Sequence, residues 1–317
     1  MHAFRSILLA ITKQHTSDME LEQAFRMAAD NRSRLLITMF DRSLETMHQL
    51  QFLPLEKKLE DLFRAQLQEE LDRLEALAWE EGIKVETLIV SGRPRQAIHQ
   101  VIKDYEIDLV IKLADTSGVL MRNQLTGNDL ALLRKCPVPV LMMADRNQLD
   151  SFTGKIMVAM DVGDPDTDSF ELNKRLLQYG VYLSAQENAQ LHLVCVWRVP
   201  ADDFSLRMLS DEELYELQEI TRSRYQRKLK EIMDSVGLQE KEEFLSVHLL
   251  KGRPSFEIQR MANDINVDLV VMGTLGRHSK GFLIGNTAEN ILNGVYCSIL
   301  AVKPEGFAYP QADVIGK

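Results

Sequence analysis

The sequence predicts two α/β domains in tandem, each built on a five-stranded, mostly parallel sheet with helices on both faces. Three observations support this fold class: the length of 317 residues, short apolar runs that alternate with helical segments, and landmarks that occur twice in the same order. Alternating strands and helices imply right-handed βαβ crossovers and hence a doubly wound sheet. We expect the domains to span residues 1–147 and 152–308, joined by a polar linker around residues 145–154.

Six short segments of the first half recur in the second half in the same order, which indicates a duplicated domain. The matched pairs are Ser6–Thr12 with Lys155–Asp161, Leu35–Phe40 with Leu191–Val196, Gly92–Pro94 with Gly252–Pro254, Asp108–Val110 with Asp268–Val270, Gly127–Asn128 with Gly285–Asn286, and Pro139–Met143 with Ser298–Val302. Because both halves carry these landmarks, a motif that only one half keeps points to a function of that half.

Short β-rich runs mark the strands of the first half at Ile7–Ile11, Leu35–Phe40, Val85–Val90, Leu109–Leu113 and Val138–Met143. Such continuous apolar runs are typical of parallel strands buried on both faces, as in a flavodoxin-like sheet. Two long segments carry apolar residues at helical spacing, and we expect both stripes to cover the core. The stripes are Leu55, Leu59, Leu62, Phe63, Leu67, Leu71, Leu74 and Leu77 in the first half, and Leu214, Leu217, Ile220, Tyr225, Leu229 and Ile232 in the second. The second helix is predicted to start at the capping box Ser210–Glu213.

Composition excludes several classes of partner. The net charge is −10 and both halves are acidic, which disfavours binding to the phosphate backbone of nucleic acids. Three widely separated cysteines, Cys136, Cys195 and Cys297, fit a reducing cytosol better than a disulfide framework. No apolar stretch is long enough to span a bilayer, and the segment Met1–Ala10 is interpreted as a first strand rather than a signal peptide. We expect a cytoplasmic protein that binds neither nucleic acid nor membrane.

A glycine-rich segment near the C-terminus carries the clearest chemistry. Gly273-Thr-Leu-Gly276 is followed by eight residues and then by Gly285-Asn286-Thr287. The segment comes after the apolar run Val267–Met272 and before the helical sequence Ala288–Leu292. Glycines let backbone N–H groups approach an anion, and the start of a helix adds a favourable dipole. The pattern therefore predicts an anion site in the second half.

With these motifs the chain resembles the universal stress protein family over nearly all of both halves, and in particular its tandem-domain members. The resemblance implies that the second half binds ATP or a related adenine nucleotide through a motif written Gly-x2-Gly-x9-Gly-Ser/Thr. It assigns Asp161 to the nucleoside, the backbone of Leu193 to adenine, and Met272 and Gly273 to the base and ribose. It assigns the phosphates to Gly276, Gly285, Asn286 and Thr287.

The chain departs from the family motif in both halves. In the second half the spacer is eight residues instead of nine, and Asn286 replaces the usual serine or threonine, although Thr287 offers a hydroxyl one position later. In the first half Thr12 stands where Asp161 stands, and Leu113 and Thr116 replace two of the glycines. We therefore expect no nucleotide to bind to the first half in the same manner.

Several residues allow two interpretations. Asp161 either anchors a ribose hydroxyl or caps the turn that follows it. Arg277 and Lys280 either neutralise phosphate charge or are solvated loop residues, and His278 is a phosphate contact or a surface residue. The acidic run Asp164–Asp168 imitates a calcium loop, but Ser169 and Arg175 occupy the required glycine and glutamate positions. His192 and Cys195 have ligand-like spacing, yet strand alternation predicts a packed histidine and a buried thiol.

No catalytic motif is present in the sequence: it has no Gly-x-Ser-x-Gly, no Walker A ending and no His-Glu-x-x-His. We expect a stress-response protein with at most slow ATP hydrolysis. Two alternatives remain open, namely an interaction protein that binds no nucleotide and a binder of another small molecule. The two halves are expected to form an internal pseudo-dimer, with Val138–Met143 pairing with Ser298–Val302, and a protein partner or a homodimer is possible.

Overall fold

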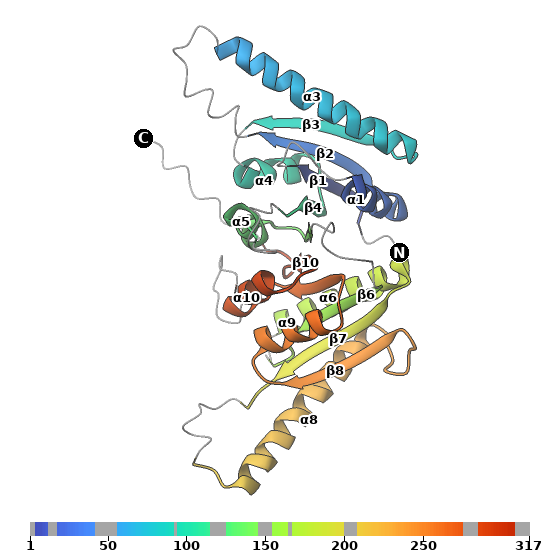
Figure 1. Ribbon diagram of the computed structural model, residues 1–317. Helices are drawn as coiled ribbons and strands as arrows, with labels where there is room; N and C mark the ends of the chain where they lie inside the picture. The colour runs from blue at the N-terminus through green and yellow to red at the C-terminus, as the bar shows by residue number, and fades with distance from the viewer. Residues whose placement is uncertain are drawn as a thin grey trace. The chain divides into compact units, whose positions relative to one another are not determined.

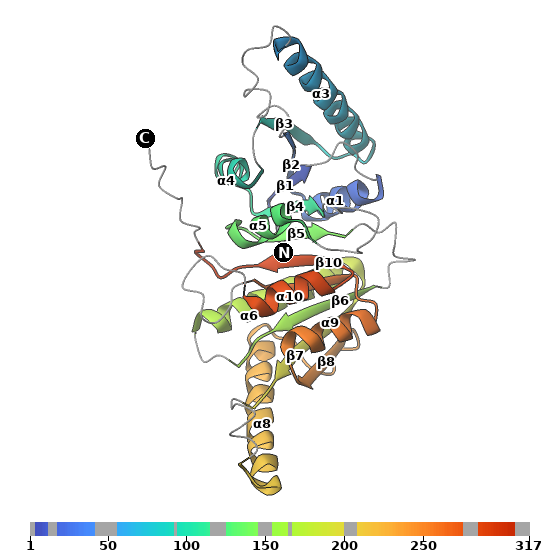
Figure 2. The same cartoon turned by 60° about the vertical axis from the view of Figure 1, so that its left-hand side comes forward.

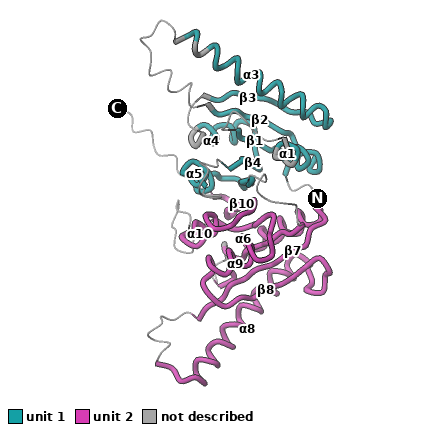
Figure 3. Tube along the Cα trace, in the orientation of Figure 1, with its two compact units in different colours: residues 1–150, 308–317 teal, residues 151–307 magenta. Residues whose placement is uncertain are grey.

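The computed structural model describes residues 4–11, 18–41, 56–91, 94–114, 125–144, 154–163, 167–199, 208–274 and 285–307. The chain divides into two compact units (Figure 3). The first comprises Met1–Asp150 together with Ala308–Lys317, and the second comprises Ser151–Phe307.

The first unit contains five strands within the described residues, and they follow the order β3-β2-β1-β4-β5 with parallel neighbours. The strands are β1 (Ser6–Ile11), β2 (Arg34–Asp41), β3 (Val85–Ser91), β4 (Leu109–Leu113) and β5 (Val140–Met143). The helices are α1 (Asp18–Asn31), α3 (Glu56–Glu80), α4 (Pro94–Asp104) and α5 (Gly127–Lys135). The strands predicted from the apolar runs are confirmed.

The second unit repeats this architecture, with the described strands in the order β8-β7-β6-β9-β10. The strands are β6 (Lys155–Met160), β7 (Gln190–Trp197), β8 (Leu245–Lys251), β9 (Leu269–Gly273) and β10 (Ser298–Val302). The helices are α6 (Thr167–Glu187), α8 (Asp211–Ser235), α9 (Pro254–Asp264) and α10 (Asn286–Gly294). The prediction of two tandem α/β domains with parallel sheets is confirmed.

Helices cover both faces of the second sheet. α6 packs against α8 on one face, and α9 packs against α10 on the other (Figure 1). Right-handed crossovers require this arrangement, because β6, β7 and β8 progress in one direction across the sheet whereas β9 and β10 progress in the other. The central strands are buried from both sides, which explains why their sequences are continuous apolar runs rather than alternating ones.

Within the described residues the apolar stripes of the two long helices are not buried along their whole length, which corrects the prediction that the whole stripes cover the core. In α8 the buried apolar residues begin at Leu229, whereas Ile220 is 60% exposed. In α3 Leu67 and Leu71 are buried, but Leu62 is 57% exposed. A helix of 25 residues is about 37 Å long, while a strand of 7 or 8 residues spans about 25 Å. The first turns of α8 therefore extend past the sheet (Figures 1 and 2).

The predicted capping box at the start of α8 is confirmed. The backbone N–H of Glu213 donates to the Ser210 hydroxyl at 3.2 Å, and the N–H of Ser210 donates to the Glu213 carboxylate at 2.8 Å. These hydrogen bonds from Ser210 lower the pKa of Glu213. Local sequence alone dictates this feature, because donor and acceptor lie three residues apart.

Two further observations bear on the expected partners. Among the described helices, none combines the length and the apolar character that crossing a bilayer requires. Within the described ranges, no three histidine, cysteine, aspartate or glutamate side chains gather into a metal site. The acidic segment Asp164–Asp166 and the linker at 145–153 lie outside the described residues. The pairing of the fifth strands of the two halves stays a prediction.

Candidate functional site

The switch point of the second sheet lies between β6 and β9. β7 flanks β6 on one side, and β10 flanks β9 on the other. In doubly wound sheets ligands bind beyond the carboxyl ends of the strands at this point. The register pairs Ala159 of β6 with Met272 of β9, so Asp161 and Thr274, each two residues further on, flank the same edge.

Asp161 lies at this edge with an exposed carboxylate. Its Oδ1 accepts a hydrogen bond from the N–H of Gly163 at 3.1 Å, so the side chain caps the turn that leaves β6. This is one of the two interpretations open from the sequence. It leaves the ribose contact possible, because a carboxylate has about four lone-pair directions.

Asn173 of α6 holds Asp161 in place, and sequence reasoning missed it. Its side-chain oxygen accepts from the N–H of Asp161 at 3.2 Å, and its side-chain nitrogen donates to the carbonyl oxygen of Asp161 at 2.8 Å. Asn173 is only 4% exposed. The available signal in the sequence was an asparagine among apolar residues at helical spacing, because an amide on a buried helix face requires hydrogen-bond partners.

Met272 and Gly273 end β9 at the same edge. Met272 is buried, and a Cβ atom on Gly273 would lie 3.0 Å from Cδ2 of Leu172 in α6. The glycine therefore lets α6 approach the end of the strand closely. This packing role stands beside the ribose contact that the family resemblance implies.

A backbone hydrogen bond joins the start of α10 to the end of β9. The N–H of Gly285 donates to the carbonyl oxygen of Thr274 at 3.2 Å. Gly285 is the N-cap of α10, and no described side chain caps this helix start. Asn286 and Thr287 open the helix and are exposed. Their N–H groups belong to the first turn, which has no intrahelical acceptors. The arrangement offers backbone donors and a positive dipole end to an anion.

Thr274 adds a hydroxyl beside this helix start. It is fully buried, and among the described residues its Oγ1 has no hydrogen-bond partner. A buried hydroxyl without a partner is destabilising, so such a group calls for an explanation such as a ligand or an ordered water. Gly276, Arg277, His278 and Lys280 lie outside the described residues, so their assignments stay predictions.

The structure does not bring Leu193 to the edge. Leu193 is fully buried in β7 and pairs in register with Val158, three residues before Asp161. Cys195 is the last residue of β7 that pairs with β6, and Val196 follows it at the end of the strand. Val196 rather than Leu193 therefore lies level with Asp161 at the carboxyl edge, because strand register rather than the start of the repeat sets which residue reaches the edge.

The helix starts also correct the alignment of the two halves. α5 begins at Gly127 with Thr126 as its N-cap, whereas Gly285 is itself the N-cap of α10. Gly127 therefore lies one position later in its helix than Gly285 does. The cap sets the start of α5, because the Thr126 hydroxyl accepts from the N–H of Asp129. The first unit has no glycine at the position that Gly285 occupies.

His192 and Cys195 do not form a site together. Cys195 is buried and His192 pairs instead with His248 of β8, with Nδ1 of the first 3.1 Å from Nε2 of the second. Burial lowers the pKa of both rings. The pair lies on β7 and β8, away from the switch point, and so belongs to the packing of the sheet.

Known proteins resemble the chain over both units. The profile of the universal stress protein family matches residues 3–144 and again residues 153–303. Universal stress protein E of Photorhabdus laumondii subsp. laumondii is 32% identical over 236 residues, which are 73% of this chain and 73% of that protein. A universal stress protein E homolog of Haemophilus influenzae is 25% identical over 314 residues, 95% of this chain and 98% of the homolog.

Solved structures match the same architecture. A protein of unknown function from Pseudomonas aeruginosa PAO1 has a TM-score of 0.70 at 25% identity, covering 96% of this chain and 94% of that one. Other universal stress proteins have been solved in complex with cAMP and with dAMP, but their TM-scores are 0.31 and 0.30, so the ligand of this chain has to follow from its own residues. With family matches in both halves, the chain belongs to the universal stress protein family as a member with two family domains.

Proposed function

We propose that the second unit binds ATP or a related adenine nucleotide at the carboxyl edge between β6 and β9, and that the chain is a cytoplasmic stress-response protein. The observation that carries this proposal concerns the described residues: among them the start of α10 has no side-chain cap, and the hydroxyl of Thr274, the residue whose carbonyl oxygen binds that helix start, has no hydrogen-bond partner. A phosphate group at this edge would accept hydrogen bonds both from the N–H groups at the start of α10 and from the Thr274 hydroxyl.

The phosphates are proposed to lie at the first turn of α10. The N–H groups of Asn286 and Thr287 donate to phosphate oxygens, and the helix end contributes the equivalent of about half a positive charge. The Thr274 hydroxyl supplies one further donor from the end of β9. Gly276 and Gly285 leave room for the phosphates to approach the backbone.

The nucleoside is proposed to lie toward β6 and β7. The carboxylate of Asp161 accepts a hydrogen bond from a ribose hydroxyl while it also caps the turn at Gly163. Met272 and Val196, both buried at the ends of their strands, offer apolar contacts to the base. Occupancy of this site is proposed to alter the glycine segment and hence a surface for a protein partner. The proposed role is binding, with at most slow hydrolysis.

Titration calorimetry with ATP, ADP and AMP tests the proposal. Thr274→Val removes the hydroxyl at nearly constant shape, so we expect nucleotide binding about 3- to 10-fold weaker, equivalent to one hydrogen bond. The chain offers a matched control in Thr38 of β2, which is also fully buried with a partnerless hydroxyl in the described structure. Thr38→Val should leave nucleotide affinity unchanged. Absence of binding at millimolar nucleotide would overturn the proposal.

Native mass spectrometry of freshly purified protein separates the alternatives. A retained adenine nucleotide supports the proposal, and a different bound mass supports another small-molecule ligand. Protein that stays without a ligand even after incubation with ATP supports an interaction protein that uses the duplicated fold as a platform.

A further inference from the structure

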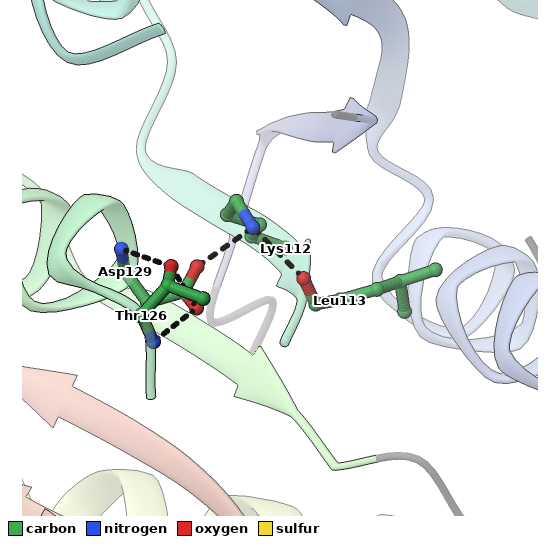
Figure 4. A network of polar contacts seen from close by, with 4 residues as sticks. All are labelled: Lys112, Leu113, Thr126 and Asp129. Carbon is green, nitrogen blue, oxygen red and sulfur yellow. Dashed lines mark hydrogen bonds and ion pairs between the residues drawn. The ribbon is translucent and has the colours of Figure 1, made fainter. Parts of the chain in front are cut away.

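The first unit contains a buried ion pair at its counterpart of the proposed phosphate site. Nζ of Lys112 in β4 lies 2.7 Å from Oδ1 of Asp129 in α5, and the two side chains are 3% and 0% exposed (Figure 4). The same ammonium group donates to the carbonyl oxygen of Leu113 at 3.0 Å. A lysine inside an apolar strand needs such partners, because an uncompensated buried charge is strongly destabilising.

The Asp129 carboxylate also caps the start of α5. Its Oδ2 accepts from the N–H of Thr126 at 3.0 Å and from the Thr126 hydroxyl at 2.8 Å. The carboxylate therefore sits at the positive end of the helix dipole and beside an ammonium group (Figure 4). The positive helix end and the ammonium group would equally stabilise an external anion.

The two units can be matched residue by residue around this network. The buried Leu132 and Leu133 of α5 correspond to Ile291 and Leu292 of α10. The C-caps match as well. The N–H of Cys136 donates to the carbonyl oxygen of Leu132, and the N–H of Val295 donates to that of Ile291. The strands β4 and β9 both start with Leu-Val directly after an aspartate and have the same length. With this alignment Lys112, Thr126 and Asp129 correspond to Met272, Gly285 and Ala288.

All three members of the network are thus replaced together in the second unit by residues without charge or hydroxyl. Met272 and Ala288 are buried, as Lys112 and Asp129 are. A buried pair tolerates loss of both charges far better than loss of one. The first unit therefore carries its own anion at the helix start, whereas the second unit leaves that position to backbone donors.

We propose that Asp129 is an internal anionic ligand that closes the first unit's site, and that the Lys112–Asp129 pair determines which unit accepts a phosphate. This deepens the proposed function, on which it rests for the identity of the second unit's ligand. A phosphate group approaching α5 would meet a carboxylate that already accepts from the N–H and the hydroxyl of Thr126 and pairs with Lys112, and like charges repel. The pair thus restricts anion binding to the second unit.

Chemical rescue in the full chain tests this assignment. Asp129→Ala reproduces Ala288 but leaves the Lys112 ammonium without its carboxylate. We expect amide hydrogen exchange in the peptide over residues 127–135 to become at least about 10-fold faster, and 100 mM sodium formate to restore most of the protection, because formate replaces the lost carboxylate. The control for general salt effects is wild-type protein, measured in sodium formate and in sodium chloride of the same concentration.

The double variant Lys112→Met/Asp129→Ala is the matched control, since it reproduces both second-unit residues. It should fold and show no response to formate beyond that of wild type. If Asp129→Ala fails to fold in sodium chloride, recovery of folding in sodium formate supports the proposal in the same way as restored exchange protection. Equal responses of the single and double variants to formate would overturn the proposal. Because the probe is formate acting on the first unit, this outcome is independent of whether the second unit binds ATP.

Discussion

Nδ1 of His192 on β7 and Nε2 of His248 on β8 lie 3.1 Å apart, and the two rings are stacked with an angle of 22° between their planes. One ring donates to the other, so the arrangement requires at least one acceptor nitrogen without a proton. For His192 the pKa is lowered by burial, then by the charge of His248 and then by that of Lys155, and for His248 it is lowered by burial. The folded second unit therefore binds protons less readily than the unfolded chain does.

This difference makes stability depend on pH. The contribution of the pair to the free energy of unfolding is full above the ordinary histidine pKa of 6.5, and it is lost as pH falls from there through the lower folded values. We expect a lower urea midpoint at pH 5.5 than at pH 7.5, followed through the fluorescence of the buried Trp197. His248→Gln should reduce this dependence. His99→Gln, in the first unit, serves as the control, and an unchanged slope in His248→Gln would contradict the prediction.

Gly180 lets α6 pack directly on β6. A Cβ atom at this position would lie 2.3 Å from Cγ2 of Val158, inside any possible contact distance. Gly180→Ala is expected to lower the free energy of unfolding by about 1–3 kcal/mol, because the helix and strand must separate. Gly127→Ala is the matched control, since nothing lies within 4 Å of the position that its Cβ atom would occupy. That variant should be neutral or stabilising by about 0.5–1 kcal/mol. Urea denaturation followed by circular dichroism measures both.

The long helix α8 allows a test of how far the sheet supports it. Leu229 is 3% exposed and Ile220 is 60% exposed in the same helix. Leu229→Ala should lower the free energy of unfolding by about 2–5 kcal/mol, because it opens a cavity against the sheet. Ile220→Ala should stay within about 0.5 kcal/mol of wild type. Comparable losses in the two variants would mean that the exposed half of α8 is covered by another molecule in solution.

These examples show which features of the fold are readable from sequence. The strands were predictable because parallel strands buried on both faces are continuous apolar runs, as in Leu109–Leu113. The start of α8 was predictable because Ser210 and Glu213 interact over three residues. The extent of the helix stripes was not, since the repeat of apolar residues at helical spacing carries no information on where the sheet beneath them ends.

The candidate site was predictable only in part for the same reason. Asp161 and Gly285 follow directly from a strand end and a helix start, both of which are local signals. The position of Leu193 depended on the register between β6 and β7, which the chain sets through packing. Matching Gly127 to Gly285 relied on residue identity, whereas the Thr126 cap sets the helix start. The pairing of Lys112 with Asp129 is a contact between separate elements and had no local signature.

Asp161 offers the sharpest test of the proposed nucleotide site, because its two roles can be separated. Asp161→Asn keeps a side-chain oxygen for the N–H of Gly163, so the turn and the stability should stay within about 0.5 kcal/mol of wild type. It removes the charge, and a hydrogen bond to a charged group contributes about 1.5–3 kcal/mol, so affinity for ATP should fall about 10- to 100-fold.

Asp161→Ala removes both roles and should lose stability as well as affinity, while Asn173→Ala should weaken both through the released backbone of Asp161. Calorimetry and urea denaturation on the same preparations measure the two quantities. If Asp161→Asn binds ATP as tightly as wild type while Asp161→Ala is destabilised, the carboxylate serves the turn alone. In that case the nucleoside end of the proposed site has to be sought elsewhere along the edge, beginning with Val196 and Met272.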